Sequence, residues 1–252
     1  RCLIASILTC KGSAKSVTSA DIAKDVSDVI NKGLRHEKDP RKIIQYLTAL
    51  KNCIVEGDDV AETKTRVESI FSAPLLGHVF EHLSNTSSDV RSLCFDVLFM
   101  LEAHNMDANP FYEAVLSVGG LRCLAETLTN DSFSSPQMDR LFKLLQASLK
   151  VQNECDETTR RAVAGALLKA LRDGSETMKD EAVVAIADLC YVDAFHGILA
   201  MGVLPLFLHR LVVVGDDDLL KDASTSRDAV LTKACSVVGQ SVDSKAIEAD
   251  RV

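Results

Sequence analysis

The sequence predicts an all-α fold built from a repeated helical unit. One pattern of fourteen residues occurs three times without a gap, at 70–83, 115–128 and 198–211. Its helix breaker, which is Pro74, Gly119 or Gly202, falls at the same column each time. The composition agrees, because 47% of residues are hydrophobic but only 5% are aromatic and none is Trp. Such a chain suits packing of Leu-, Val- and Ala-rich helices better than a β-sandwich.

Apolar residues at helical spacing locate the individual helices. A first helix is predicted from about Ser19 to Leu34, and a second opens at Asp39-Pro40, where Pro is tolerated in the first turn. Each later unit should contain a short helix, a corner at the breaker, a second helix and a third helix. The second helices should end at Leu83, Leu128, Leu171 and Leu211. The third helices are expected at about 41–55, 89–104, 137–152, 176–190 and 225–239.

The leucines that end successive second helices lie 49, 45, 43 and 40 residues apart, starting from Leu34. Periods of about 40–47 residues are typical of HEAT and armadillo arrays. From about residue 20 to 240 the chain resembles that superfamily, and the Gly before an apolar second helix (Gly119-Gly120, Gly202-Val203) is closer to armadillo than to HEAT. It departs from the pattern at Pro74, and in a third unit whose first helix is reduced to a turn near Asp156.

The resemblance implies a right-handed superhelical solenoid of about five armadillo-like repeats in a single domain, 1–252. The repeats would span roughly 20–56, 57–104, 107–152, 156–190 and 192–240, followed by a tail at 241–252. Stacked units bury apolar stripes that no unit can bury alone, and a small rotation per repeat curves the array. By resemblance, the third helices would line a concave groove.

Charge and cysteine usage narrow the functional classes. A net charge of −8 argues against nucleic acid, whose affinity for proteins rests on Lys and Arg, and against a polybasic membrane surface. No apolar run approaches the ~18–20 residues of a membrane span. The eight cysteines are scattered without a Cys-x-x-Cys pair, which favours reduced core thiols and a cytoplasmic protein.

One segment suggests an enzyme. His78 and His82 stand at i and i+4 with Glu81 between them, an arrangement that resembles the inverted zinc-protease motif. A third ligand would have to come from far along the chain, at Glu154 or Glu157. The repeat alignment instead places His78 at a half-buried packing column and His82 at an exposed one. We therefore expect no metal, no cofactor and no catalytic residue, with a zinc-dependent hydrolase as the less favoured alternative.

Polar residues on the third helices, away from the apolar stripes, are the candidate groove residues. They predict a groove of mixed charge, formed by Lys42, Gln45, Asn52, Ser92, Asp96, Lys143, Gln146, Lys150, Asp188 and Lys233. The acidic insertion at Gly215 to Asp222 is interpreted as a solvated loop that could contact a basic partner.

These observations predict a non-enzymatic scaffold or adaptor that holds a partner protein, as a peptide, a helix or a folded domain. Because the chain opens on Arg1, a module of a larger cytoskeletal or trafficking protein is favoured over a chaperone cofactor. A monomer is expected. A structural subunit of a large assembly is the main alternative, suggested by the apolar start at Cys2-Leu3-Ile4.

Overall fold

The computed structural model describes residues 19–55, 64–65, 67–68, 70–104, 109–130, 134–151, 155–214 and 229–239. All regular elements within these ranges are helical, so the predicted all-α class is confirmed there. The acidic insertion, the tail from residue 241 and the apolar start lie outside the described residues. Chain contacts define two compact units, with the boundary between Cys123 and Leu124.

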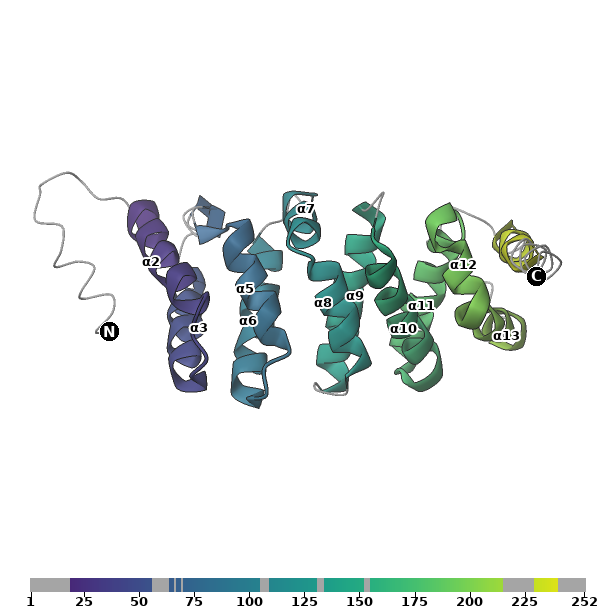
Figure 1. The fold of residues 1–252 in the computed structure, drawn as a ribbon, viewed down its shortest axis with the longest axis horizontal. Coiled ribbons are helices and arrows are strands. Elements are labelled where there is room, and N and C mark those ends of the chain that lie inside the picture. The colour runs from purple at the N-terminus through teal and green to yellow at the C-terminus, as the bar shows by residue number, and fades with distance from the viewer. Residues whose placement is uncertain are drawn as a thin grey trace, which may run out of the picture. The chain divides into compact units, whose positions relative to one another are not determined.

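The first unit contains α2 (Ser19–Leu34), α3 (Pro40–Val55), α5 (Ala73–Leu83), α6 (Ser88–His104) and α7 (Asn109–Ser117). Helix α8 (Gly120–Thr129) begins in this unit. Helix α3 packs against α2 and α6, while α5 contacts α2, α6 and α7 (Figure 1). The predicted apolar stripe of α3 is confirmed as buried, at Ile43, Leu47, Leu50 and Ile54. The predicted third helices 41–55 and 89–104 are therefore neighbours.

The breaker column has a different structure at each of its two positions in the first unit. Pro74 lies in the first turn of α5, behind the N-cap Ser72, whose hydroxyl accepts a hydrogen bond from the Leu75 N–H. Gly119 lies between α7 and α8 with φ of 70°. That left-handed conformation favours Gly, and it turns the chain into α8.

The second unit contains α9 (Ser135–Val151), α10 (Glu157–Asp173), α11 (Glu176–Leu189) and α13 (Leu204–Val214). Residues 229–239 are also helical. Helix α11 packs against α9, α10 and α13. Side-chain caps explain where α10 and α11 begin: Asp156 accepts from the Thr159 N–H, and Ser175 accepts from the Met178 N–H. Gly174 is the C-cap of α10, which ends at Asp173.

The predicted corner at Gly202-Val203 is wrong. After α12 (His196–Ile198) the chain continues as a π-helical segment, η2 (Leu199–Val203), directly into α13. The N–H of Leu204 bonds to the carbonyl of Leu199, so the helical hydrogen bonding is not interrupted. Among the described residues only Gly119 has a positive φ, and Gly202 does not adopt the conformation that made Gly119 a corner. Gly202 therefore lies within a π-helical turn of a continuous helix, not at a corner.

No described helix combines the length and the apolarity needed to cross a membrane.

Candidate functional site

The clearest arrangement of the expected groove residues lies on α9 and α11. Lys143 Nζ on α9 is 3.7 Å from Glu181 Oε1 on α11. Two helical turns further along both helices, Lys150 lies near enough to Asp188 for its positive charge to lower the pKa of that carboxyl. Because both pairs have the same sequence offset, the neighbouring helices α9 and α11 run parallel.

We call this surface the rung face. It comprises Lys143, Ala147 and Lys150 on α9, at i, i+4 and i+7, and Glu181, Val184 and Asp188 on α11, at i, i+3 and i+7. The two lysines are exposed, and the other four residues are half-buried. Its centre is thus apolar, with cations along one helix and carboxylates along the other.

Asp188 is the least solvated charge of the rung face. Burial raises the pKa of its carboxyl, and the positive charge of Lys150 partly counteracts that effect. No ion pair within 4.0 Å forms between the two side chains, unlike Lys143 and Glu181. Asp188 therefore retains acceptor capacity at a half-buried position.

Lys233, another of the predicted groove residues, lies on the helix at 229–239. Its ammonium lies 6.0 Å from the ring centroid of Tyr191, just beyond the end of α11, at the limit of a cation–π contact. Tyr191 is 47% exposed, so the residue remains accessible to solvent. Sequence reasoning did not single out Tyr191, although an aromatic at the end of a third helix was a usable signal.

Gln146 does not lie where the sequence analysis placed it. Its residue surface is only 9% exposed, and it belongs to a broad buried arc of α9. That arc includes Leu144, Leu145 and Ser148, since α9 buries more of its circumference than the single predicted stripe. Ser148 satisfies its hydroxyl by bonding back to the carbonyl of Leu144. The expected exposure of Gln146 is wrong because a polar side chain alone does not mark the solvent-facing side of a helix.

The first unit has a similar cross-helix pair. Lys51 Nζ on α3 donates to Asp96 Oδ2 on α6 at 2.6 Å, and both side chains are more than one third exposed. Sequence analysis named Asp96 but missed Lys51, which faces its partner 45 residues along the chain. Lys42, near the start of α3, has its Nζ 3.3 Å from Oε2 of Glu37, which precedes the helix. The remaining candidates of this unit, Gln45, Asn52 and Ser92, are exposed.

The two histidines of α5, His78 and His82, form hydrogen bonds with protein groups. His78 Nδ1 is 3.0 Å from Glu81 Oε2, the carboxylate that the motif would use as a base. His82 was expected to be exposed but is half-buried, and its Nε2 has no described hydrogen-bond partner. Burial lowers the pKa of His82, opposed by its hydrogen bond to the backbone of Leu34. The described residues contain no group of three potential metal ligands.

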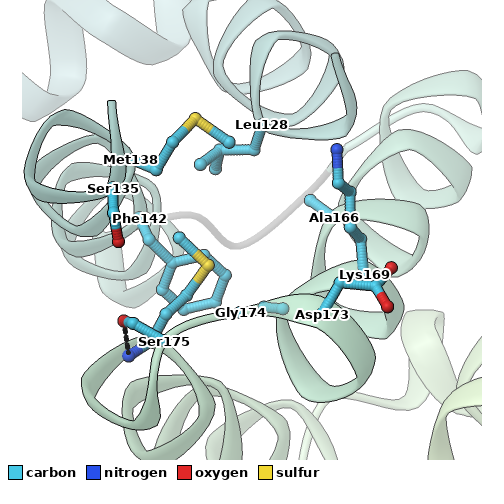
Figure 2. Close-up of a pocket in the computed structure, with 11 residues that line it drawn as sticks. Leu128, Ser135, Met138, Phe142, Ala166, Lys169, Asp173, Gly174 and Ser175 are labelled. Atoms are coloured by element: carbon cyan, nitrogen blue, oxygen red, sulfur yellow. Dashed lines mark hydrogen bonds between the residues drawn. The ribbon is translucent and has the colours of Figure 1, made fainter. Parts of the chain in front are cut away.

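A hollow in the second unit has no counterpart in the sequence analysis. Its volume is about 220 Å³, and it lies where α8 and α10 end and α9 and α11 begin (Figure 2). Its walls come mainly from Leu128, Met138, Phe142, Met178 and the α10 residues Ala166 and Ala170. Four elements contribute to it, so no local sequence pattern could have revealed it.

Comparisons with known proteins give no family. No protein-family profile matches the chain, and no curated protein matches it either. Among solved structures, a crystal structure of an engineered protein from a structural genomics consortium aligns with 16% sequence identity and a TM-score of 0.38. That alignment covers 96% of this chain and 96% of the engineered chain.

Proposed function

We propose that this chain is a non-enzymatic protein-interaction module of the armadillo-like helical repeat type, and that the rung face on α9 and α11 contacts its partner. The observation that supports this most is that Lys143 contacts Glu181 while the charge of Lys150 acts on Asp188, as expected for two parallel neighbouring helices. Two adjacent parallel helices then present regularly spaced polar groups around an apolar centre.

The charges of the rung face suit a peptide or helix of mixed polarity. A partner can place carboxylates or carbonyls over Lys143 and Lys150, and donors over Asp188. The apolar strip formed by Ala147 and Val184 can meet a small apolar side chain. Exposed ion pairs contribute little stability, so the lysines can exchange their intramolecular partners for those of a ligand at small cost.

The test is affinity capture from a cell lysate followed by mass spectrometry, with the Lys143→Glu, Lys150→Glu double variant. A matched control is Lys24→Glu, Lys32→Glu, which makes the same charge change at two exposed positions of α2. We expect wild type and the α2 control to retain the same small set of proteins. The rung-face variant should lose them while circular dichroism shows it folded.

Capture that is equal for all three proteins would contradict the proposal. It would favour binding through another surface, as expected for a structural subunit of a large assembly.

A further inference from the structure

We propose that the hollow between α8, α9, α10 and α11 is an anchor site that takes one leucine-sized aliphatic side chain from a partner protein. The inference rests on the proposed function, because it assumes that the ligand is a protein. It concerns a different surface from the rung face and can be tested separately.

The lining of the hollow is suited to an apolar guest. Leu128, Phe142, Ala166 and Ala170 are each no more than 3% exposed, and they form a fixed floor. Met138 and Met178 complete the walls, and their thioether side chains can adjust to a guest because they are unbranched and polarisable. Figure 2 shows the Met138 side chain and the Phe142 ring on one side of the hollow, with Ala166 and Lys169 on the other.

Apart from Ser135, Lys169, Asp173 and Ser175, the side chains that line the hollow offer water no strong polar partner. The hydroxyl of Ser175, which lies at the margin, is already bonded to Asp139 Oδ1 at 2.6 Å and to the Met178 N–H. A water needs two to four polar partners to be held well, so an apolar guest would displace weakly held water at little cost.

The size of the hollow decides between classes of guest. Its volume of about 220 Å³ is below the ~300–1,000 Å³ of typical small-molecule sites. It exceeds the roughly 150 Å³ of an engineered apolar cavity that binds benzene, a molecule comparable to a leucine side chain. One anchoring side chain therefore fits, whereas a lipid chain or a cofactor does not.

The rim argues for a guest attached to a neutral main chain. Lys169 and Asp173 both lie there, with opposite charges. The Lys169 ammonium donates to the Thr129 carbonyl at 2.9 Å, and the Asp173 carboxylate is held by the neighbouring Arg172 at 2.8 Å. With Arg172 included, these groups carry one net positive charge, but each is already hydrogen-bonded within the chain, which leaves them little capacity to bind an anionic head group. The rim is compatible with a peptide backbone, which carries donors and acceptors but no charge.

The test uses protein labelled with ¹³C at the methionine methyl groups and titrated with N-acetyl-leucine methylamide. The sequence has five methionines, so Met138 and Met178 report on the hollow and the other three serve as internal references. We expect saturable shifts of those two methyl signals at millimolar probe. N-acetyl-alanine methylamide should cause at least tenfold weaker binding, because it leaves most of the hollow empty.

A filling variant provides the control. Ala170→Leu places its new carbons in the hollow, so the protein should stay folded and lose the response to the leucine probe at least tenfold. Ala166→Val does the same from the neighbouring turn, should Ala170→Leu not fold. The Lys143→Glu, Lys150→Glu variant should keep the full response.

Three results would overturn the proposal: no shift of Met138 and Met178 with the leucine probe, an unchanged response in both filling variants, or a response to hexanoate at least as strong as that to the leucine probe. Because the rung-face variant is scored separately, failure here is distinguishable from failure of the proposed function.

Discussion

Gly120, the first residue of α8, lies against the ring of Phe80 in α5. A Cβ atom at this position would stand 2.7 Å from Phe80 Cε2 and 2.8 Å from the carbonyl oxygen of Val115. Neither the buried ring nor the backbone oxygen can move away easily. The contact explains why this start of α8 requires Gly, beyond the turn that Gly119 makes.

Gly120→Ala should therefore destabilise the protein, by about 1–3 kcal/mol, because overpacking displaces a buried ring. Gly77→Ala on α5 is the matched control. A Cβ there meets Val118 at an ordinary 3.6 Å, so this helical Gly can be replaced with a gain of about 0.5–1 kcal/mol. Urea unfolding measures both changes, and equal effects at the two positions would contradict the contact.

A second prediction concerns Arg210, which joins α13 to α11. Its side chain is 16% exposed and donates to Glu176 Oε2 at 2.8 Å and to Asp180 Oδ1 at 3.0 Å. Arg210→Ala should lower the free energy of unfolding by on the order of 1 kcal/mol, which is the upper end of the range for surface ion pairs. Arg172→Ala should cost less, since Arg172 is 66% exposed and contacts only its neighbour Asp173. Thermal unfolding of the two variants makes the comparison.

The same cluster predicts a pH dependence. Hydrogen bonds from Lys179 and Arg210 lower the pKa of Glu176 from 4.5 to about 2. A carboxyl with a lowered folded-state pKa stabilises the protein above its unfolded pKa, and the contribution is lost as pH falls. Wild type should therefore lose stability relative to Glu176→Gln between about pH 4.5 and pH 2. Parallel stability curves for the two proteins over that window would refute the assignment.

Thiol reactivity should follow burial. Cys94 is fully buried, and burial raises its pKa strongly, while the pKa of Cys190 rises to about 11. Cys235 is exposed. Because the thiolate is the reactive form and must be reachable, iodoacetamide at pH 8 should label Cys235 at least tenfold faster than Cys94 or Cys190. Peptide mass spectrometry resolves the sites, and rapid labelling of Cys94 in folded protein would show that α6 packs differently.

Leu124 tests the packing of the repeated pattern. It is fully buried in α8, at a column that the repeat alignment marks as apolar. Leu124→Asp should lower the free energy of unfolding by more than the roughly 2–5 kcal/mol lost in a buried Leu→Ala change, because it also buries an unpaired charge. Arg122→Ala, at an exposed position of the same helix, is the control. An unchanged melting temperature for Leu124→Asp would show that the repeat register is incorrect.

The sequence alone predicts where the helices lie. It does not predict the backbone conformation at positions where one sequence pattern is compatible with several conformations. Helix α2 matches its predicted bounds because its apolar spacing, unlike a breaker, specifies a single conformation. The column shared by Pro74, Gly119 and Gly202 instead adopts a helix start, a left-handed corner and a π-helical turn. Glycine permits several backbone conformations, and proline, whose φ is fixed, is compatible with the first turn of a helix. The packing around each residue then decides the outcome.

Side-chain partners across helices were the least predictable feature of the site. Lys143 and Lys150 were identified as candidates from their helix face, but their partners Glu181 and Asp188 depend on the register between α9 and α11. That register is set by packing of apolar side chains, which no local pattern encodes. The hollow was missed for the same reason.

The most direct measurement of the central claim is site-specific photocrosslinking in a cell lysate. A photoreactive amino acid replaces Ala147, which lies between Lys143 and Lys150 on the rung face. In a matched protein it replaces Ala162, a half-buried position on α10. The account predicts that the Ala147 probe crosslinks to a defined protein partner, that the Lys143→Glu, Lys150→Glu changes abolish this crosslink, and that the Ala162 probe does not form it. A partner that crosslinks equally from both positions, or only from Ala162, would contradict the claim that the rung face holds it.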